Sequence, residues 1–373
     1  MRITDALVFD PAEGFVARDL CMKDGLIAQE DHRAVSAPGC YLIPGLTDLH
    51  FHGCRGADFS DGDPEGLAEM AKYELSRGVT QICPAGMTLD NDQLVKICKV
   101  AAGHNAAKVS GAELVGINLE GPFLSAGKKG AQNGEWLQNP NLALLDQLIE
   151  ASGGLVKLVS MAPELEGGME FIKQAKDKVT ISVAHTTANY DTAMEAFQAG
   201  ARQVTHLYNA MPPFAHRDPG VVGAASDCGQ VMCELICDGV HIHPAVVRAT
   251  FKMMGKDRMI LVSDTMRAAG MPDGDYTLGG QAVQVKGNRA TLSDGTLAGS
   301  VTDLMACLQT AVSFGIPLAD AVTAAAVNPA KVLGIYNRLG SLDVGKEANV
   351  AVLDDHLNLK AVIYHGEVVA GSL

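Results

Sequence analysis

The chain has 373 residues, of which 47% are hydrophobic and 19% are charged, a composition typical of a soluble globular protein with a large apolar core. Its net charge of −14 repels nucleic acid, and no run of lysine and arginine offsets that repulsion locally. No apolar run reaches the roughly 18 residues that span a bilayer, and Arg2 and Asp5 interrupt the segment where a signal peptide would lie. We therefore expect no nucleic-acid or membrane partner and a cytoplasmic location.

Eight short apolar runs follow one another along the chain, and each ends in polar or small residues. They are residues 41–53, 78–86, 113–122, 154–164, 179–187, 201–210, 230–241 and 257–266. Most of the intervals between them show helical periodicity with a glycine stop, as in 64–78, 142–153 and 190–200. Strand then helix, repeated eight times, predicts an α/β fold, a (β/α)8 TIM-type barrel, over residues 43–339.

The two ends of the chain differ from the middle, because residues 1–42 and 340–373 alternate in short β-like stretches. Neither segment is long enough to form a core of its own. We therefore expect the two termini to pair in one small β-sandwich domain beside the barrel.

Chemically capable side chains gather at the carboxyl ends of the predicted strands, where a barrel places its catalytic groups. They are His50, His52, Glu120, His185, His206, His241 and Asp264. His50 and His52 are two residues apart, so both imidazoles lie on one side of an extended segment and can bind a metal ion. Taken alone, this pair fits two unrelated histidines equally well.

The order of the motifs resembles the amidohydrolase superfamily and, within it, the family of N-acetylglucosamine-6-phosphate deacetylases. The motifs are PGLTDLHFH at 44–52, EGPF at 120–123, AHT at 184–186, THLYNAM at 205–211 and SDTMRAAGMPDG at 263–274. The likeness covers nearly the whole chain, including GSLDVGKEANVAVLD at 340–354, and THLYNAM followed by Arg217 is its most diagnostic part.

The resemblance implies a metal centre. Glu120, His185 and His206 are expected to bind the principal divalent ion. His50 and His52 imply a second ion, with Glu120 as the bridge and Asp264 as a further ligand, and we favour two ions over one. Zinc and iron suit such a set of nitrogen and oxygen ligands equally well.

The resemblance also implies the reaction, which is hydrolysis of N-acetyl-D-glucosamine 6-phosphate to D-glucosamine 6-phosphate and acetate by a metal-activated hydroxide. Asp264 would act first as general base and then as general acid, although an aspartate after a strand is by itself more often a helix N-cap. Gln132 stands where the family often has a histidine, and its amide can still donate to the substrate carbonyl.

The phosphate of the substrate is expected to bind Arg217, His241 and the backbone N–H groups of Asn209 and Ala210, as the resemblance implies. Without the resemblance, Arg217 reads as a solvated surface charge. Related enzymes complete this site from a neighbouring subunit, so a homodimer is implied as well. Residues 271–281 are rich in turn formers, and we expect a loop there that can act as a lid.

Three alternative functions stay open at this point. The same reaction on N-acetylgalactosamine 6-phosphate differs by one inverted hydroxyl, which a list of motifs does not resolve. A metal-dependent deaminase shares the histidine pair and the late aspartate, but needs a glutamate shortly after a late-strand histidine, and His206 is followed by Leu-Tyr-Asn. A non-catalytic metabolite-binding protein would be expected to lack a ligand or Asp264, and none is missing.

Overall fold

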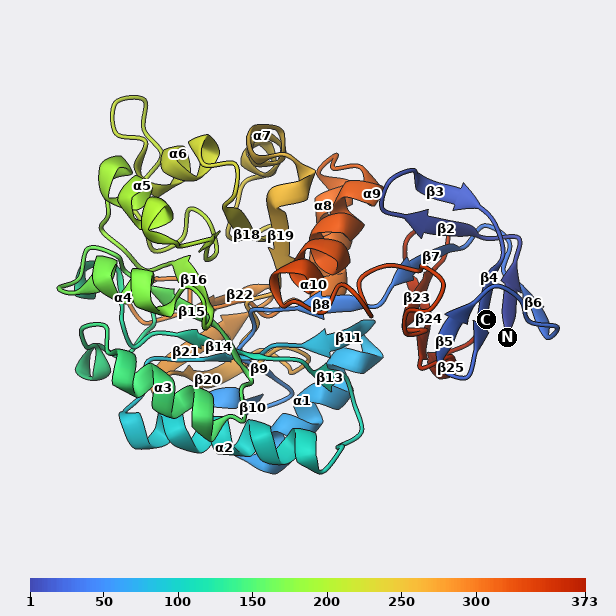
Figure 1. Cartoon of the computed structure of the whole chain (residues 1–373), viewed down its shortest axis with the longest axis horizontal. Coiled ribbons are helices and arrows are strands. Elements are labelled where there is room, and N and C mark those ends of the chain that lie inside the picture. The colour runs from blue at the N-terminus through green and yellow to red at the C-terminus, as the bar shows by residue number, and fades with distance from the viewer.

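A computed structural model describes all 373 residues, and it shows a ring of parallel strands surrounded by helices with a smaller pair of sheets at one side (Figure 1). The ring runs through β8 (Leu46–Asp48), β11 (Val79–Ile82) with β12 (Ala85–Gly86), β13 (Glu113–Leu114) with β14 (Ile117–Glu120), β15 (Val156–Met161), β16 (Thr180–Val183), β17 (Gln203–Val204), β18 (Met232–Ile236) and β19 (Met259–Val262). Each of the eight predicted apolar runs contains at least one of these strands.

All pairings within the ring are parallel, and they follow the order of the chain. The first and last segments also meet, because Asp264 N donates to His50 O at 2.9 Å and His52 N donates to Thr265 O at 2.7 Å. This closed order agrees with the predicted (β/α)8 barrel, which brings all the carboxyl strand ends to one mouth.

Helices cover the outside of the ring. They are α1 (Pro64–Ser76), α2 (Asn91–Ala106), α3 (Leu142–Ala151), α4 (Gly168–Ala175), α5 (Tyr190–Ala199), α6 (Gly220–Asp227), α7 (Pro244–Met254), α8 (Leu304–Ser313), α9 (Leu318–Val322), the π-helical turn η5 (Thr323–Val327) and α10 (Asn328–Val332). Short 3-10 helices lie at η1 (Phe59–Asp61), η2 (Ala126–Lys128), η3 (Gly134–Trp136) and η4 (Lys256–Arg258). The helices predicted over 64–78, 142–153 and 190–200 correspond to α1, α3 and α5. No helix combines the length and the apolar character that crossing a membrane requires.

The terminal segments form two further sheets, one from N-terminal strands alone and one from strands of both ends of the chain. The four-stranded sheet has the order β5 (Leu26–Ala28), β4 (Leu20–Lys23), β1 (Arg2–Thr4), β6 (Ala34–Ser36). The six-stranded sheet has the order β25 (Glu367–Gly371), β24 (Leu359–Tyr364), β23 (Val350–Leu353), β7 (Tyr41–Pro44), β2 (Leu7–Asp10), β3 (Gly14–Ala17). A hairpin of β9 (Gly53–Cys54) and β10 (Ala57–Asp58) lies at the barrel mouth.

The central strands of the six-stranded sheet, β23 and β7, are buried on both faces. Val350 and Val352 of β23 belong to an apolar cluster of 15 residues shared with the four-stranded sheet. Ala351 and Leu353 alternate with them and belong instead to the 70-residue core of the barrel. The terminal sheets are therefore fixed against the barrel by continuous apolar packing.

The expectation of a turn-rich loop over 271–281 is wrong. This segment enters an antiparallel sheet of β20 (Gly274–Leu278), β21 (Gln281–Lys286) and β22 (Arg289–Thr291). Leu278, Val283 and Val285 alternate inward and form a separate apolar cluster with Met87 and other residues, which stabilises two strands where a loop was expected. The two glycines at 279 and 280 have φ angles of 55° and 79° and form the turn.

The chain passes from the six-stranded sheet into the ring at Gly45, between β7 and β8. A Cβ atom at this position would lie within 2.8 Å of the Cβ of Thr80, a fully buried residue of β11. Because the contact includes the Thr80 Cβ itself, rotating the threonine side chain cannot relieve it. Glycine is therefore required where the two parts of the structure join.

We predict that Gly45→Ala lowers the stability of the protein by about 1–3 kcal/mol, the usual cost of overpacking a core. The matched control is Gly103→Ala in α2, where an added Cβ meets nothing within 4 Å and alanine favours the helix by about 1 kcal/mol. Thermal denaturation of the two variants should shift in opposite directions. An unchanged melting temperature for Gly45→Ala would contradict the steric argument.

Candidate active site

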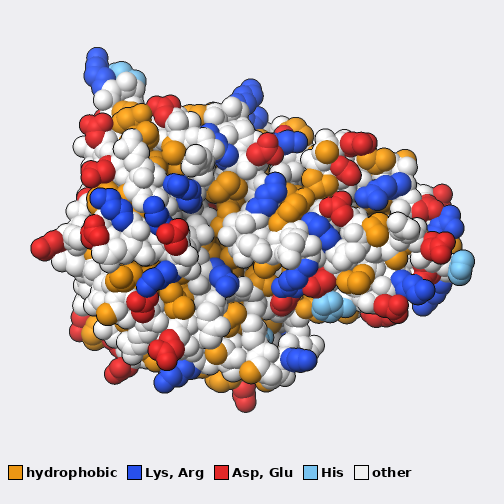
Figure 2. All heavy atoms as spheres, in the orientation of Figure 1, with side chains coloured by type: hydrophobic (Ala, Val, Ile, Leu, Met, Phe, Trp, Pro, Cys, Tyr) orange, Lys and Arg blue, Asp and Glu red, His pale blue; other side chains and the backbone are white.

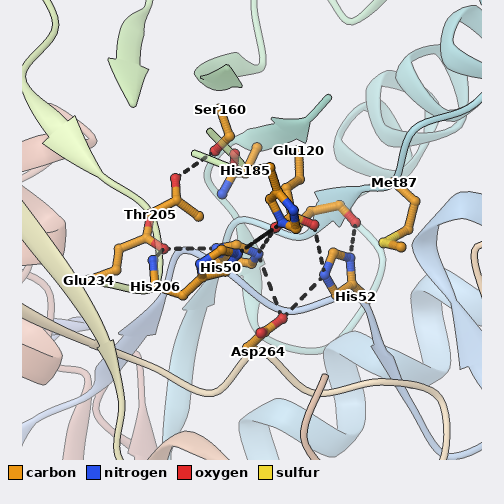
Figure 3. Close-up of polar contacts among 12 residues, drawn as sticks. His50, His52, Met87, Glu120, Ser160, His185, Thr205, His206, Glu234 and Asp264 are labelled. Carbon is orange, nitrogen blue, oxygen red and sulfur yellow. Dashed lines mark hydrogen bonds and ion pairs between the residues drawn. The ribbon is translucent and has the colours of Figure 1, made fainter. Parts of the chain in front are cut away.

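Six titratable side chains from five strand ends converge at the mouth of the ring (Figure 3). They are His50, His52, Glu120, His185, His206 and Asp264, and each is at most 7% exposed. Glu120 is the last residue of β14, whereas the other five follow the ends of their strands. The structure thus brings together all six metal ligands that the resemblance implied.

The backbone at three of these positions is in the left-handed region. The φ angles are 42° at His185, 27° at His206 and 50° at Asp264. Such conformations cost about 1–3 kcal/mol each for residues other than glycine, and they persist where the surroundings impose them. Strain at three strand ends of one barrel mouth, those of β16, β17 and β19, is typical of a functional site.

The first cluster of ligands is centred on Glu120. Its Oε1 lies 3.0 Å from His185 Nε2 and 3.0 Å from His206 Nε2, and the two nitrogens are 3.1 Å apart. Side-chain ligand atoms of these three residues all fall within 4.8 Å of one another. Such close packing of imidazole nitrogens and a carboxylate is typical of a cation site.

The second cluster consists of His50, His52 and Asp264, and it shares Glu120 with the first. His52 Nε2 lies 3.2 Å from Asp264 Oδ1 and 3.3 Å from Glu120 Oε2. His50 Nε2 lies 3.5 Å from Glu120 Oε1 and 3.7 Å from Asp264 Oδ1, and it has no hydrogen-bond partner although it is buried. Glu120 therefore presents an oxygen to each cluster.

The outer nitrogen of three histidines is tied to an acceptor behind the site. His50 Nδ1 lies 2.8 Å from Glu234 Oε2, His52 Nδ1 lies 3.1 Å from Ala85 O, and His185 Nδ1 lies 2.8 Å from Lys128 O. Because a carbonyl or carboxylate oxygen needs a donor, each Nδ1 carries the proton when the imidazole is neutral. Each Nε2 then directs its lone pair at the centre of the site, as a metal ligand must.

The electrostatics of the site favour a positively charged occupant. Burial alone lowers the pKa of His50, but the carboxylates of Glu234 and Glu120 outweigh it and raise the pKa to about 9. Burial likewise raises the pKa of Glu120, yet the charges of His185 and His50 hold it well below its usual range. The residues present thus fit a metal centre by donor type, by orientation and by charge.

A cavity of about 320 Å³ opens above the two clusters, a volume within the usual range for small-molecule sites. Its lining includes His52, Glu120, Gln132, His185, His206, Asn209, Ala210, His241 and Asp264. His50 lies beneath this surface and is fully buried.

Gln132 holds the bridging carboxylate in place. Its Oε1 accepts from Thr88 N at 2.7 Å, and its Nε2 donates to Glu120 Oε2. The second hydrogen of Nε2 has only the weak acceptor Met87 Sδ, at 3.6 Å. One N–H of Gln132 is therefore committed to Glu120, and the other is free to exchange partners.

The predicted phosphate ligands are only partly assembled. The N–H of Ala210 makes no hydrogen bond within the chain, whereas that of Asn209 donates to His206 O at 2.9 Å. His241 Nδ1 lies 2.7 Å from Asp238 Oδ2, which leaves its Nε2 available to the cavity that it lines. Arg217 is exposed and does not line the cavity.

The segment between β17 (Gln203–Val204) and α6 (Gly220–Asp227), which carries the arginine, projects from the molecule at the top left of Figure 1. Figure 2 shows acidic and basic side chains intermixed over the same face of the molecule. Arg217 is therefore exposed on a projecting segment and is not part of the wall of the cavity.

Sequence reasoning missed the groups behind the ligands. Glu234, inside the apolar strand β18, had a signal, because a carboxylate within a buried strand needs a partner. The carbonyl groups of Ala85 and Lys128 had none, since any residue type supplies a carbonyl. Gln281 was also missed, and its Nε2 donates to Ala131 O at 2.5 Å, which fastens the β20–β21 turn to the segment that carries Gln132.

Comparison with known proteins agrees with this geometry. The amidohydrolase family matches residues 41–369. The N-acetylglucosamine-6-phosphate deacetylase of Bacillus subtilis (strain 168) is 38% identical over 342 residues, which cover 90% of this chain and 86% of that protein. The N-acetylgalactosamine-6-phosphate deacetylase of Escherichia coli O157:H7 is 35% identical over 94% of either chain. A mutant N-acetyl-D-glucosamine-6-phosphate deacetylase from Mycobacterium smegmatis, solved with N-acetyl-D-glucosamine-6-phosphate, superposes with a TM-score of 0.93 at 31% identity over 99% of both chains.

We predict that Glu120→Ala removes all bound divalent metal, because its carboxylate faces both clusters, whereas His50→Ala removes one ion and leaves the other. The control is His356→Ala, since this imidazole is 81% exposed and distant from the site in the fold. Metal content is measured by plasma mass spectrometry after the loaded proteins are desalted. Retention of metal by Glu120→Ala, or complete loss from His50→Ala, would contradict the shared-carboxylate arrangement.

Proposed function

The chain belongs to the amidohydrolase family, and we propose that it hydrolyses N-acetyl-D-glucosamine 6-phosphate to D-glucosamine 6-phosphate and acetate. One observation carries the proposal: two clusters of metal ligands share Glu120 beneath a cavity of about 320 Å³, with Asp264 at its floor. This arrangement suits the hydrolysis of an amide. The related proteins compared above, each of which aligns with this chain over 86% or more of its length, are deacetylases of amino sugar phosphates.

Two divalent ions, zinc or iron, are proposed rather than one. Glu120, His185 and His206 would hold the first, and His50 and His52 would hold the second, with Glu120 between them and Asp264 within reach. Bound there, such ions lower the pKa of water to about 7 and polarise a carbonyl oxygen. The fit of both clusters, including the unpartnered Nε2 of His50, supports the count.

Asp264 is the residue proposed to move the proton. Burial raises its pKa, but the hydrogen bond from His52 and the charges of His50 and His52 outweigh burial, so the pKa is lowered and the carboxylate is ionised at neutral pH. It can accept a proton from the attacking water as the new C–O bond forms. It can then return that proton to the sugar nitrogen as the C–N bond breaks, which balances the hydrolysis.

Gln132 is proposed to assist at the substrate carbonyl. Its second N–H, now beside Met87 Sδ, can donate instead to the oxygen that becomes negative during attack. Because an amide carries no charge, this contribution is smaller than that of a protonated histidine. More of the carbonyl polarisation then falls to the metal centre.

The phosphate end of the substrate is proposed to lie near Ala210, Asn209 and His241, with Arg217 completing the site. The free N–H of Ala210 supports this placement, and Asp238 orients His241 toward the cavity. The N–H of Asn209 would first have to release His206 O. Arg217 is exposed and lies outside the lining of its own chain's cavity, which supports a homodimer in which this arginine serves the neighbouring subunit.

The division of the chain stays part of the proposal. Residues 1–42 and 340–373 would form a small β-sandwich domain, and residues 43–339 the metal-dependent barrel. The 15-residue apolar cluster shared by the two terminal sheets supports the sandwich, and the crossing from β7 (Tyr41–Pro44) into the ring supports a boundary close to residue 42. A cytoplasmic location also remains a prediction.

A second substrate is favoured by one comparison, because the relative that acts on N-acetylgalactosamine 6-phosphate covers as much of this chain as the glucosamine enzymes do. The two sugars differ in one hydroxyl, and both offer the same acetamide and the same phosphate. The metal clusters and Asp264 would serve either epimer.

Assay of the purified, metal-loaded protein with both sugar phosphates tests the proposed function. We predict acetate release that stops on chelation and returns with Zn²⁺ or Fe²⁺, with the glucosamine epimer preferred. Asp264→Asn should lower kcat by about 10²–10⁴-fold, the usual contribution of general acid–base catalysis. Absence of acetate from both substrates would refute the deacetylase assignment.

Mixing two inactive variants tests the homodimer. We predict that Arg217→Ala and Asp264→Asn chains, inactive apart, regain up to about a quarter of wild-type activity when refolded together in equal amounts, because half of the dimers are mixed and each has one intact site. Each variant refolded alone is the control. No recovery in a mixture shown to contain mixed dimers would mean that Arg217 serves its own subunit.

A further inference from the structure

Glu234 is a fully buried carboxylate that does not line the cavity above the two clusters and hydrogen-bonds none of the residues predicted to bind substrate. It lies in β18 (Met232–Ile236) between Cys233 and Leu235, both of which are also fully buried. Burying an ionised carboxylate costs several kcal/mol unless it is well compensated. Such a residue within an apolar strand needs a reason to be there.

Three contacts account for both oxygens of Glu234. Oε2 lies 2.8 Å from His50 Nδ1 and accepts from His206 N at 3.2 Å, while Oε1 accepts from Gln203 Nε2 at 2.5 Å. Figure 3 shows Glu234 on the side of His50 that faces away from Glu120 and Asp264. One carboxylate therefore contacts a ligand of each metal cluster.

The contact with His50 decides which nitrogen of that ring faces the site. Because Nδ1–H of His50 donates to Glu234, Nε2 keeps its lone pair toward Glu120 and Asp264, at 3.5 and 3.7 Å. In His52 and His185, Nδ1 instead donates to a neutral backbone carbonyl, that of Ala85 or Lys128. His50 alone has a negative charge behind it, which makes its imidazole a stronger ligand.

We propose that Glu234 is the positioning residue for the second metal ion: it fixes the ring of His50 and raises the affinity of the cluster formed by His50, His52 and Asp264. The inference rests on the proposed two-ion centre. Gln203 Nε2 donates a hydrogen bond to the other oxygen of Glu234, which restrains the carboxylate from rotating away from the imidazole.

Competition titration of the metal-free protein with Zn²⁺ and a chromophoric chelator tests the proposal without any substrate. We expect Glu234→Ala to weaken one of the two ions by about 10–100-fold, as is usual when an outer carboxylate is removed. Glu234→Gln should lie between the alanine variant and wild type, because its amide oxygen still accepts from His50 while the charge is lost. Glu74→Gln is the matched control, since this carboxylate is also buried in the barrel but has no hydrogen bond to the site.

Combination with His50→Ala shows whether Glu234 acts through that histidine. The double variant should hold the same single ion as His50→Ala, with the same affinity, because the two changes disable one cluster. Wild-type affinity for both ions in folded Glu234→Ala overturns the inference, as does loss of the remaining ion from the double variant. If the alanine variant does not fold, wild-type affinity in Glu234→Gln is decisive against it. If the wild-type protein binds a single ion, the two-ion centre itself is refuted. If it binds two ions whose affinities do not change in Glu234→Ala, only the role of Glu234 is refuted.

Discussion

The buried charge of Glu120 is the constraint on which the rest of the site depends. A carboxylate that is 2% exposed needs positive or donor groups on every side, and here four imidazoles and the amide of Gln132 surround it. Four of these five groups are themselves fixed from behind, by Glu234, by the carbonyl groups of Ala85 and Lys128, or by Thr88 N, whereas Nδ1 of His206 has no partner. The site is thus arranged around one negative charge. This arrangement is stable only when a bound cation or protonated histidines balance the charge of Glu120.

The amidohydrolase barrel and its ligands could be predicted from the sequence because both leave periodic signals. Apolar runs of strand length marked the ring, and the resemblance placed His50, His52, Glu120, His185, His206 and Asp264 at its mouth, where the structure has them. The β20–β21 hairpin was missed because Gly279 and Gly280 read as loop residues, while the alternation of Leu278, Val283 and Val285 across them is a strand signal.

Other features of the site could not be read from the sequence for physical reasons. The left-handed backbone at His185, His206 and Asp264 has no sequence signature, because it is imposed by the surrounding packing. The commitment of Gln132 to Glu120 depends on a loop that Gln281 fastens from 149 residues away. Arg217 was predicted as a phosphate ligand, yet no pattern in the sequence indicates that it lies outside the cavity of its own chain.

The backbone bonds that close the ring also set the geometry of the second metal cluster. Asp264 N donates to His50 O and His52 N donates to Thr265 O, so the backbone bonds that join the first segment of the barrel to the last also set the spacing of His50, His52 and Asp264. These side chains lie 3.2–3.7 Å apart because their main chains are bonded to each other, and rotamer choice adds little freedom. A substitution that opened this seam would therefore disturb the metal cluster even if every ligand were kept. Gly45 joins the six-stranded terminal sheet to β8, and β8 leads directly to His50 and His52. The terminal sheets contribute no ligand, but their packing therefore helps to position this end of the active site.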